Sequence, residues 1–154
     1  MRSFFRSFRF ALRGLRLCLR ERNFRFQLAL SAYMYGYLLV YDWFELSRAE
    51  WAVLVLSTAL VLAAEAVNTA IEAAVNLASP DRHPLAARAK DAAAGAVLLC
   101  SLGAVAAGVA ILYQPEAFRA LAAYYTQKPL MLLVLGLTLT ATGLFVFPDW
   151  GAKK

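Results

Sequence analysis

A long, largely apolar segment, residues 51–78, most restricts how the chain can fold. A helix rises about 1.5 Å per residue, so about 20 apolar residues cross the ~30 Å hydrocarbon core of a bilayer. Hydrophobic residues make up 62% of the 154 residues, and the mean hydropathy is +0.58, which is too apolar for an ordinary soluble domain. The sequence therefore predicts an all-α membrane protein with three or four spans: residues 26–41, 51–78 and 85–113, and an extra C-terminal segment, 129–147.

Half of the 16 Lys and Arg residues lie in the first 25 positions. On a helix, most of these arginines fall within an arc of about 80°, opposite Phe4, Phe8, Leu12, Leu15 and Leu19. This pattern predicts an amphipathic helix over residues 1–25 that lies on a membrane surface. RNA-binding signatures of alternating aromatic and basic residues are absent, so we expect the phospholipid bilayer as partner and no nucleic acid.

The distribution of Lys and Arg also predicts the orientation in the inner (cytoplasmic) membrane. The Arg-rich start should lie in the cytoplasm, while the 42–50 loop, with one Arg and three acidic residues, should lie outside. The turn at 79–84 is then cytoplasmic. The predicted organisation is a surface helix (1–25), a three-span core (26–113), an external loop (114–128) and an additional span with a short basic tail (129–154).

Four polar residues interrupt the 51–78 run at helical spacing: Glu65, Asn68, Glu72 and Asn76. They share one helix face. Glu72 follows Trp51 by 21 residues, or about 31 Å, which places it at the cytoplasmic edge of the hydrocarbon core, with Glu65 about 10 Å deeper. An ionised carboxylate within the bilayer costs about 2.5–3.5 kcal/mol, so two of them on one face indicate a functional site.

Phosphoryl transfer from Mg-ATP to a lipid hydroxyl needs the residue types that this region supplies. Carboxylates bind Mg²⁺, cations stabilise phosphates, and a base accepts the proton of the hydroxyl. Glu72 and Glu21 are the candidate Mg²⁺ ligands, Lys90 the candidate phosphate contact, and Glu65 the candidate base. A Walker A or kinase Gly-rich loop is absent, so side chains would have to hold the nucleotide. Cys18 and Cys100 lack metal-site spacing, and we interpret both as small apolar residues.

Three segments resemble the small integral-membrane lipid kinases of bacteria, the diacylglycerol kinase and undecaprenol kinase family: ERNFR (21–25), EAVNTAIEAAVN (65–76) and HPLAARAKDAAAGAVLL (83–99). The resemblance covers roughly residues 4–113, and ERNFR and HPLA are more similar to the undecaprenol kinase branch. It implies a homotrimer of three-span protomers with a surface helix, ATP and Mg²⁺ at the cytoplasmic interface, and a site shared between neighbouring protomers.

The resemblance also implies roles position by position. Glu65 would be the catalytic base with Asn68 beside it, Glu21 and Glu72 would bind Mg²⁺, and Asn76 would lie behind the metal, where the family usually has Asp. The implied ATP-binding residues are Glu21, Glu72, Asp81, Arg82, His83, Lys90 and Asp91. The implied lipid-substrate residues are Glu65, Arg13, Asn23 and Arg25.

Two other classes stay open at this point. A small proton-coupled membrane transporter also has about four short helices and a membrane Glu, but it needs neither an interfacial Lys-Asp pair nor paired metal carboxylates. An inactive structural relative would tolerate the loss of Glu65 and Glu72. The sequence does not distinguish undecaprenol from diacylglycerol, because Ala, Leu and Val walls discriminate weakly between lipids.

Overall fold

The structure is a computed structural model that describes residues 2–81 and 83–148. Its helices are α1 (Arg2–Cys18), α2 (Arg22–Val40), α3 (Arg48–Ala78), α4 (Pro84–Leu112), α5 (Pro115–Gln127) and α6 (Leu130–Val146). The described residues include no β-strand, which confirms the all-α prediction for this part of the chain.

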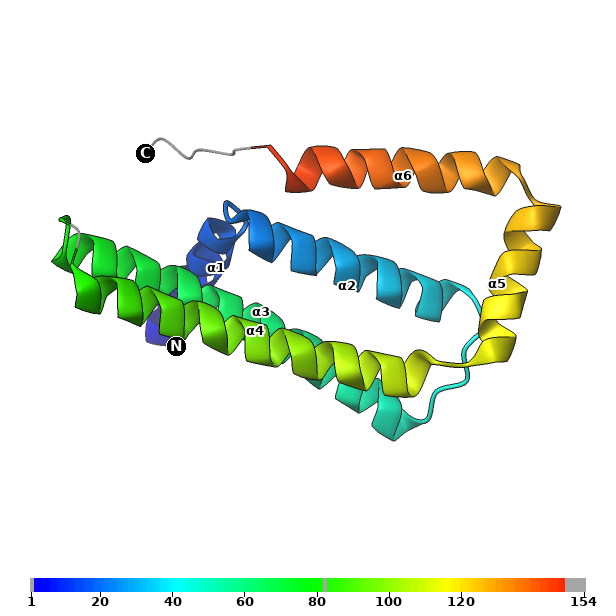
Figure 1. Cartoon of the computed structure of the whole chain (residues 1–154), viewed down its shortest axis with the longest axis horizontal. Coiled ribbons are helices and arrows are strands. Elements are labelled where there is room, and N and C mark those ends of the chain that lie inside the picture. Colours follow the sequence, from blue (N-terminus) through cyan, green and yellow to red (C-terminus); the bar gives the residue numbers. More distant parts are fainter. Residues whose placement is uncertain (1, 82, 149–154) are drawn as a thin grey trace.

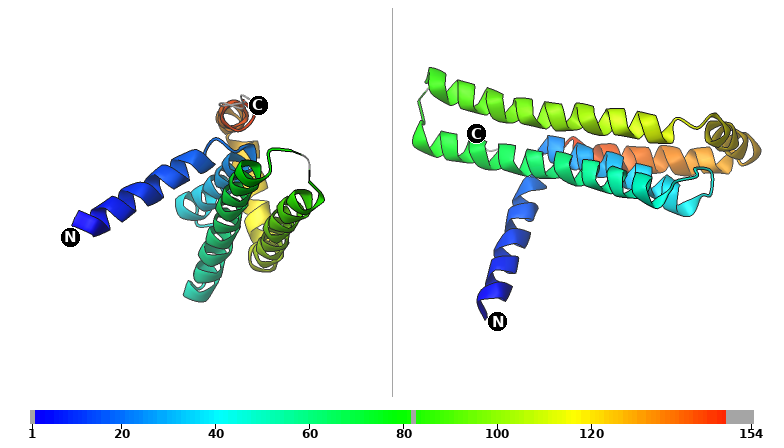
Figure 2. Two further views of the ribbon diagram at one scale, coloured as in Figure 1. Left: turned by 90° about the vertical axis from the view of Figure 1, so that its left-hand side faces the viewer. Right: turned by 90° about the horizontal axis from the view of Figure 1, so that it is seen from below.

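Helix α1 projects away from the other helices as a separate arm (Figure 2). Its large apolar side chains, such as Phe8 and Leu15, are exposed, as an interfacial helix requires. The helix ends at Cys18, because the backbone N–H of Glu21 turns back to the Cys18 carbonyl at 2.9 Å. The amphipathic helix expected over residues 1–25 is therefore shorter than expected, and Glu21 caps the start of α2 instead of ending α1.

Helices α3 and α4 form an antiparallel hairpin and pack along each other (Figure 1). Helix α3 starts with a capping box, in which the Ser47 hydroxyl accepts from Glu50 N and the Glu50 carboxylate accepts from Ser47 N. Helix α4 starts with His83 at the N-cap and Pro84 in the first turn, a favoured position for proline. Local sequence signals thus define where each of the two helices begins.

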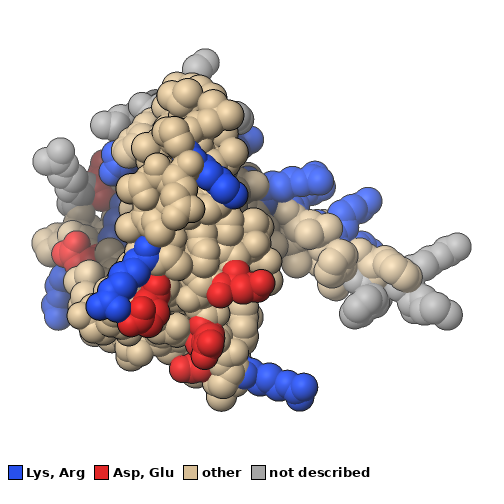
Figure 3. Space-filling model, turned by 90° about the vertical axis from the view of Figure 1, so that its right-hand side faces the viewer, with Lys and Arg blue, Asp and Glu red and all other residues tan. Residues whose placement is uncertain are grey.

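Helix α2 packs on α3, and α6 packs along the other side of α2 (Figure 1). Helix α5 lies across one end of the bundle and connects α4 to α6. The turn between α3 and α4, the elbow between α1 and α2 and the end of α6 lie toward the opposite end. Figure 3 views the α5 end, where acidic and basic side chains mix, while the α1 arm beside it carries basic side chains.

Residues 114–128, expected to be an external loop, contain helix α5. Pro115 occupies the first turn, where a missing N–H is tolerated, and Glu116 in the same turn complements the helix dipole. The helix ends at Gln127, just before Lys128 and Pro129. Proline disfavours helical geometry in the residue before it, so the chain bends here. The angle between α5 and α6 is 106°.

By length and composition, α3 and α4 can each cross a membrane, and the bent pair of α5 and α6 adds a third candidate span. Residues 2–81 and 83–148 thus contain two or three candidate spans, whereas the sequence predicts three or four. Helix α2 does not qualify, because its first turns contain Arg22, Asn23, Arg25 and Gln27. Helix α6 alone has 17 residues, which is about 25 Å of helix.

Candidate active site

The elbow between α1 and α2 carries two of the polar residues that the sequence singles out. Glu21 is the N-cap residue of α2 but makes no capping hydrogen bond through its side chain, so its carboxylate is not committed to the helix end. Asn23 follows in the first turn. Both residues interact with Glu65, the first residue of the polar stripe on α3, so the elbow lies close to that end of the stripe.

Glu65 lies at the centre of this arrangement, with only 3% of its surface exposed. The Asn23 side chain hydrogen-bonds to its carboxyl group, and Glu72 and Glu21 interact with it electrostatically. The structure therefore brings three carboxylates from α3 and the elbow into one neighbourhood. Such an arrangement gathers carboxylates, which are the side chains that Mg²⁺ and general-base chemistry both use.

Asn68 connects the buried and exposed parts of the stripe. It is 8% exposed, and its Nδ2 donates to Glu72 Oε1 at 2.9 Å. Its Oδ1 is buried and has no hydrogen-bond partner within the described residues. A buried amide oxygen without a partner can accept from a ligand or a neighbouring chain. The side chain of Asn68 thus holds the Glu72 carboxylate and retains one acceptor.

Asn76 and Lys90 form a second polar pair, nearer the α3–α4 turn. Lys90 Nζ donates to Asn76 Oδ1 at 2.6 Å. Since the amide is neutral, this contact orients the ammonium group but leaves its positive charge uncompensated. Asp91, the next residue on α4, is exposed.

The turn between α3 and α4 contains the other residues predicted to bind nucleotide. His83 Nδ1 accepts from Leu85 N at 3.2 Å, so the imidazole caps α4. The side chain of Asp81 is exposed, while its backbone carbonyl accepts from Ser79 Oγ. Arg82 lies outside the described residues. The turn therefore adds an acid and a histidine beyond the Asn76–Lys90 pair.

Two of the predicted lipid-substrate residues, Arg13 and Arg25, make their contacts with groups other than Glu65. Arg13 is exposed on α1, with its guanidinium 5.9 Å from the centre of the Phe10 ring. Arg25 is 2% exposed and turns away from Glu65 toward backbone carbonyls of α6 and of the elbow. Its acceptors on α6 lie more than 120 residues away in the sequence, so no local pattern could have indicated this contact.

Cys18 was interpreted as a simple apolar residue but lies beside the carboxylate cluster. It is 6% exposed, and it interacts electrostatically with Glu21 and Glu65. Burial raises the pKa of its thiol above the usual range, and the two carboxylates act in the same direction. The only local signal for this position is its place at the end of α1, next to Glu21.

Within residues 2–81 and 83–148, no group of three or more His, Cys, Asp or Glu side chains is placed to hold a metal ion. Mg²⁺, however, is commonly bound by one or two carboxylates together with substrate phosphates and water. The donor set of Glu21 and Glu72 meets this requirement only when a nucleotide contributes the remaining oxygens.

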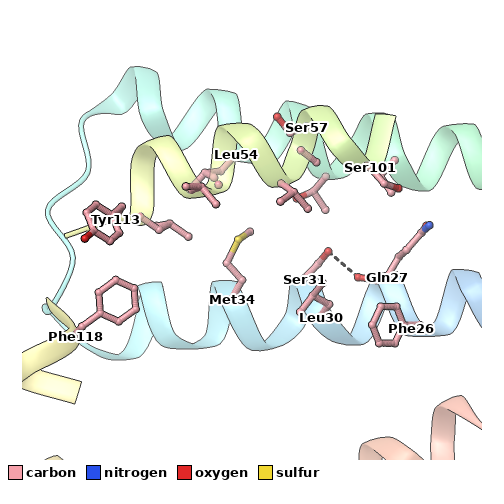
Figure 4. A pocket seen from close by; sticks show the side chains of 17 residues that line it. Phe26, Gln27, Leu30, Ser31, Met34, Leu54, Ser57, Ser101, Tyr113 and Phe118 are labelled. Carbon is pink, nitrogen blue, oxygen red and sulfur yellow. Dashed lines mark hydrogen bonds between the residues drawn. The ribbon is translucent and has the colours of Figure 1, made fainter. Parts of the chain in front are cut away.

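An apolar groove of about 600 Å³ runs between α2, α3 and α4 (Figure 4). Its lining on α3 includes Val61, which lies one helical turn from Glu65. Its walls are mainly Leu, Val, Phe and Met side chains. Gln27 lies at the Phe26 end of the groove, and its buried Oε1 has no partner among the described residues. The groove thus offers an apolar surface with a few hydroxyl and amide groups, which suits a lipid chain.

Comparison with known proteins shows which family the central part of the chain resembles. The sequence model of the family described as prokaryotic diacylglycerol kinase matches residues 9–112. An undecaprenol kinase of Bacillus subtilis is 44% identical over 97 residues, which cover 61% of this chain and 75% of that protein. A diacylglycerol kinase of Synechocystis is 48% identical over 65 residues, 42% of this chain and 37% of that protein. No solved structure matches.

Proposed function

Because the chain belongs to the prokaryotic diacylglycerol kinase family and is a lipid kinase, we propose that it transfers the γ-phosphate of ATP to the hydroxyl of undecaprenol or diacylglycerol. The observation that carries this proposal is the buried Glu65, hydrogen-bonded to Asn23 and flanked by Glu21 and Glu72. Its product would feed phospholipid synthesis or the recycling of an envelope lipid carrier.

Glu65 acts as the general base. Its burial one turn from the groove supports this role, since a lipid hydroxyl would reach it while the lipid chain stays in apolar surroundings. The carboxylate takes the hydroxyl proton as the lipid oxygen bonds to the γ-phosphorus, and the bond to the β–γ bridging oxygen breaks to release ADP. Asn23 orients the carboxylate, and Asn68 orients Glu72.

Glu21 and Glu72 would hold Mg²⁺ with the phosphate oxygens of ATP, and the ion would supply positive charge for the transferring phosphoryl group. Lys90 adds a second positive charge, which Asn76 orients without neutralising. The turn residues Asp81, Arg82 and His83, with Asp91, contact the nucleotide further from the membrane. The donor atoms come from side chains of several elements, as expected for a nucleotide site without a glycine-rich loop.

The lipid lies in the apolar groove with its hydroxyl toward Glu65. Asn23, beside Glu65, and Arg13, on the surface helix, contact the lipid headgroup region. Arg25 is not assigned to the lipid, since backbone carbonyls satisfy its guanidinium. We place the carboxylate cluster at the cytoplasmic face of the inner membrane, because the Arg-rich α1 lies at this end of the bundle.

Three copies of the chain form the working enzyme. The two-carboxylate metal set and the unpartnered Asn68 Oδ1 support a site that a neighbouring protomer completes. Native mass spectrometry from detergent should give a mass of three chains. A monomer with full activity would contradict the shared site.

The decisive experiment is a transfer assay with purified protein, Mg-ATP labelled at the γ-phosphate, and undecaprenol or diacylglycerol in mixed micelles. Labelled lipid phosphate is expected with at least one acceptor, and the ratio of the two kcat/KM values identifies the preferred lipid. Transfer to neither lipid would contradict the assignment. Dye efflux driven by a proton gradient, without ATP turnover, would instead support a transporter.

A further inference from the structure

The guanidinium of Arg25 joins two helix ends that are distant in the sequence. Its Nη1 donates to the carbonyls of Leu19 (3.1 Å) and Arg20 (2.8 Å), just after the end of α1. Its Nε and Nη2 donate to the carbonyl of Val146 (3.2 and 2.7 Å), and Nη2 also donates to the carbonyl of Pro148 (2.7 Å), at the end of α6. All five N–H groups of a guanidinium can be satisfied by these bonds.

The guanidinium of Arg25 stabilises both helix ends. The last carbonyls of a helix lack partners within the helix and carry partial negative charge, so a cation at that position is favourable. Arg25 is 2% exposed, which makes the bonds stronger than they would be in water and makes their loss more damaging. Val146, which supplies one of the carbonyls, is likewise 2% exposed.

The C-terminal extension, defined here as α5 and α6, is anchored to α2 at further points. The hydroxyls of Tyr33, near the middle of α2, and Thr142, in the C-terminal part of α6, hydrogen-bond at 3.2 Å. At the α5 end, Tyr37 hydrogen-bonds to Tyr125, and the Tyr124 ring packs edge-on against Tyr41. The extension therefore follows α2 along its whole length (Figure 1).

The extension lies outside residues 9–112, the part of the chain that matches the family, yet its end contacts the elbow that carries Glu21 and Asn23. We propose that the C-terminal extension is a working part of the kinase site, in which Arg25 is a positioning residue that ties the α6 carbonyls to the α1–α2 elbow. This inference rests on the proposed function for the roles of Glu21 and Asn23. Without the α6 carbonyls, three of the five guanidinium bonds are lost and the elbow is held only locally.

The thiol of Cys18 reports on the elbow independently of kinase activity. It is buried at the end of α1, so a maleimide should react with it slowly while the elbow is closed. In a Cys100→Ser background, Cys18 is the single cysteine of the chain. The rate of its alkylation then measures how often the elbow opens.

The test uses full-length variants in this background. Arg25→Ala should raise the alkylation rate by about tenfold or more, which is the effect expected for losing a charged hydrogen bond, and Arg25→Lys should give an intermediate rate. Val146→Trp should displace the end of α6 and raise the rate similarly, because the site is buried. Leu144→Trp, at a position 69% exposed, is the matched control and should leave the rate unchanged.

Kinetics connect the elbow to the site. Arg25→Ala and Val146→Trp should both lower kcat/KM for Mg-ATP by about tenfold, and the double variant should be no worse than Arg25→Ala alone. An unchanged alkylation rate in Val146→Trp, additive effects in the double variant, or unaltered kinetics with an opened elbow would each overturn the inference. If the unmodified protein phosphorylates neither lipid, the proposed function fails, while the alkylation series still decides whether α6 holds the elbow.

Discussion

A buried carboxylate near the middle of an apolar helix needs partners that lower the free energy of its charged form. Glu65 has one in Asn23, which donates a hydrogen bond, whereas Glu21 and Glu72 repel its charge. The role proposed for Glu65 therefore depends on the elbow, which carries Asn23 and Glu21, as much as on α3.

Replacing Glu65 by Gln keeps the shape of the side chain but removes the proton acceptor. We expect kcat to fall by about 10² to 10⁴-fold, the usual contribution of a general base, while the dissociation constant of Mg-ATP changes little. Single-turnover transfer assays and nucleotide-binding titrations measure the two quantities. Glu45→Gln, an exposed carboxylate outside the cluster, is the control. Unchanged kcat in Glu65→Gln would refute the base assignment.

In the proposed site, Lys90 contributes positive charge and Asn76, which accepts a hydrogen bond from it, orients the ammonium group. Lys90→Ala should raise KM for ATP by about tenfold, because a charge-assisted contact to phosphate is lost, with a smaller change in KM for lipid. Arg88→Ala on the same helix removes an equal charge from an exposed side chain and should have little effect. Equal effects of the two substitutions would indicate a general electrostatic contribution instead of a specific contact. Initial-rate kinetics at fixed ionic strength distinguish these outcomes.

At the scale of the helices, capping signals decide where each element starts. Ser47 and Glu50 cap α3 reciprocally, and His83 and Pro84 start α4. These starts matter for the site, because α3 carries Glu65 and α4 carries Lys90. Loss of the cap would loosen the end of α3 that is farther from the carboxylates. It should therefore lower the stability of the fold more than the catalytic rate.

Ser47→Ala should therefore lower the free energy of unfolding by about 1 kcal/mol, the usual value of an N-cap hydroxyl, with kcat unchanged. Unfolding in detergent micelles, followed by circular dichroism, measures this change. Ser57→Ala is the comparison, since its hydroxyl donates only to the Val53 carbonyl one turn back. A comparable loss in both variants would argue against the capping box as the source of the stability.

On the scale of the whole molecule, the groove between α2, α3 and α4 exists only because three helices converge. Gly108 lines it, and a Cβ added there would contact no atom within 4 Å, so a larger side chain can extend into the groove without displacing the backbone. A substitution at Gly108 can therefore reduce the volume of the groove while the backbone of α4 stays in place.

Gly108→Leu should raise KM for a long-chain lipid acceptor by about tenfold, because its side chain occupies space that the lipid needs, while KM for ATP stays the same. Gly103→Leu is the matched control: it lies on α4 with equally open surroundings but does not line the groove. Steady-state kinetics with both substrates measure the effect. If the two variants behave alike, the lipid binds elsewhere.

The family and the helical class were predictable from the sequence, because both depend on local patterns. The spacing of EAVNTAIEAAVN specifies one helix face, and its apolar surroundings indicate a membrane. Glu65, Asn68 and Glu72 were singled out for that reason. The elbow after Cys18 and helix α5 were not predicted, since short turns and amphipathic segments carry weaker signals than long apolar runs.

Only the tertiary structure decided what Arg25 and Cys18 contact. Sequence reasoning placed Arg25 with the lipid because of its neighbours in ERNFR, but its guanidinium bonds to carbonyls at the far end of the chain. Backbone carbonyls have no side-chain signature, so the sequence does not show which helix end is nearby. Sequence determined which residues are candidates for the chemistry, because that depends on side-chain type and local period. Packing over long separations decided which of them meet.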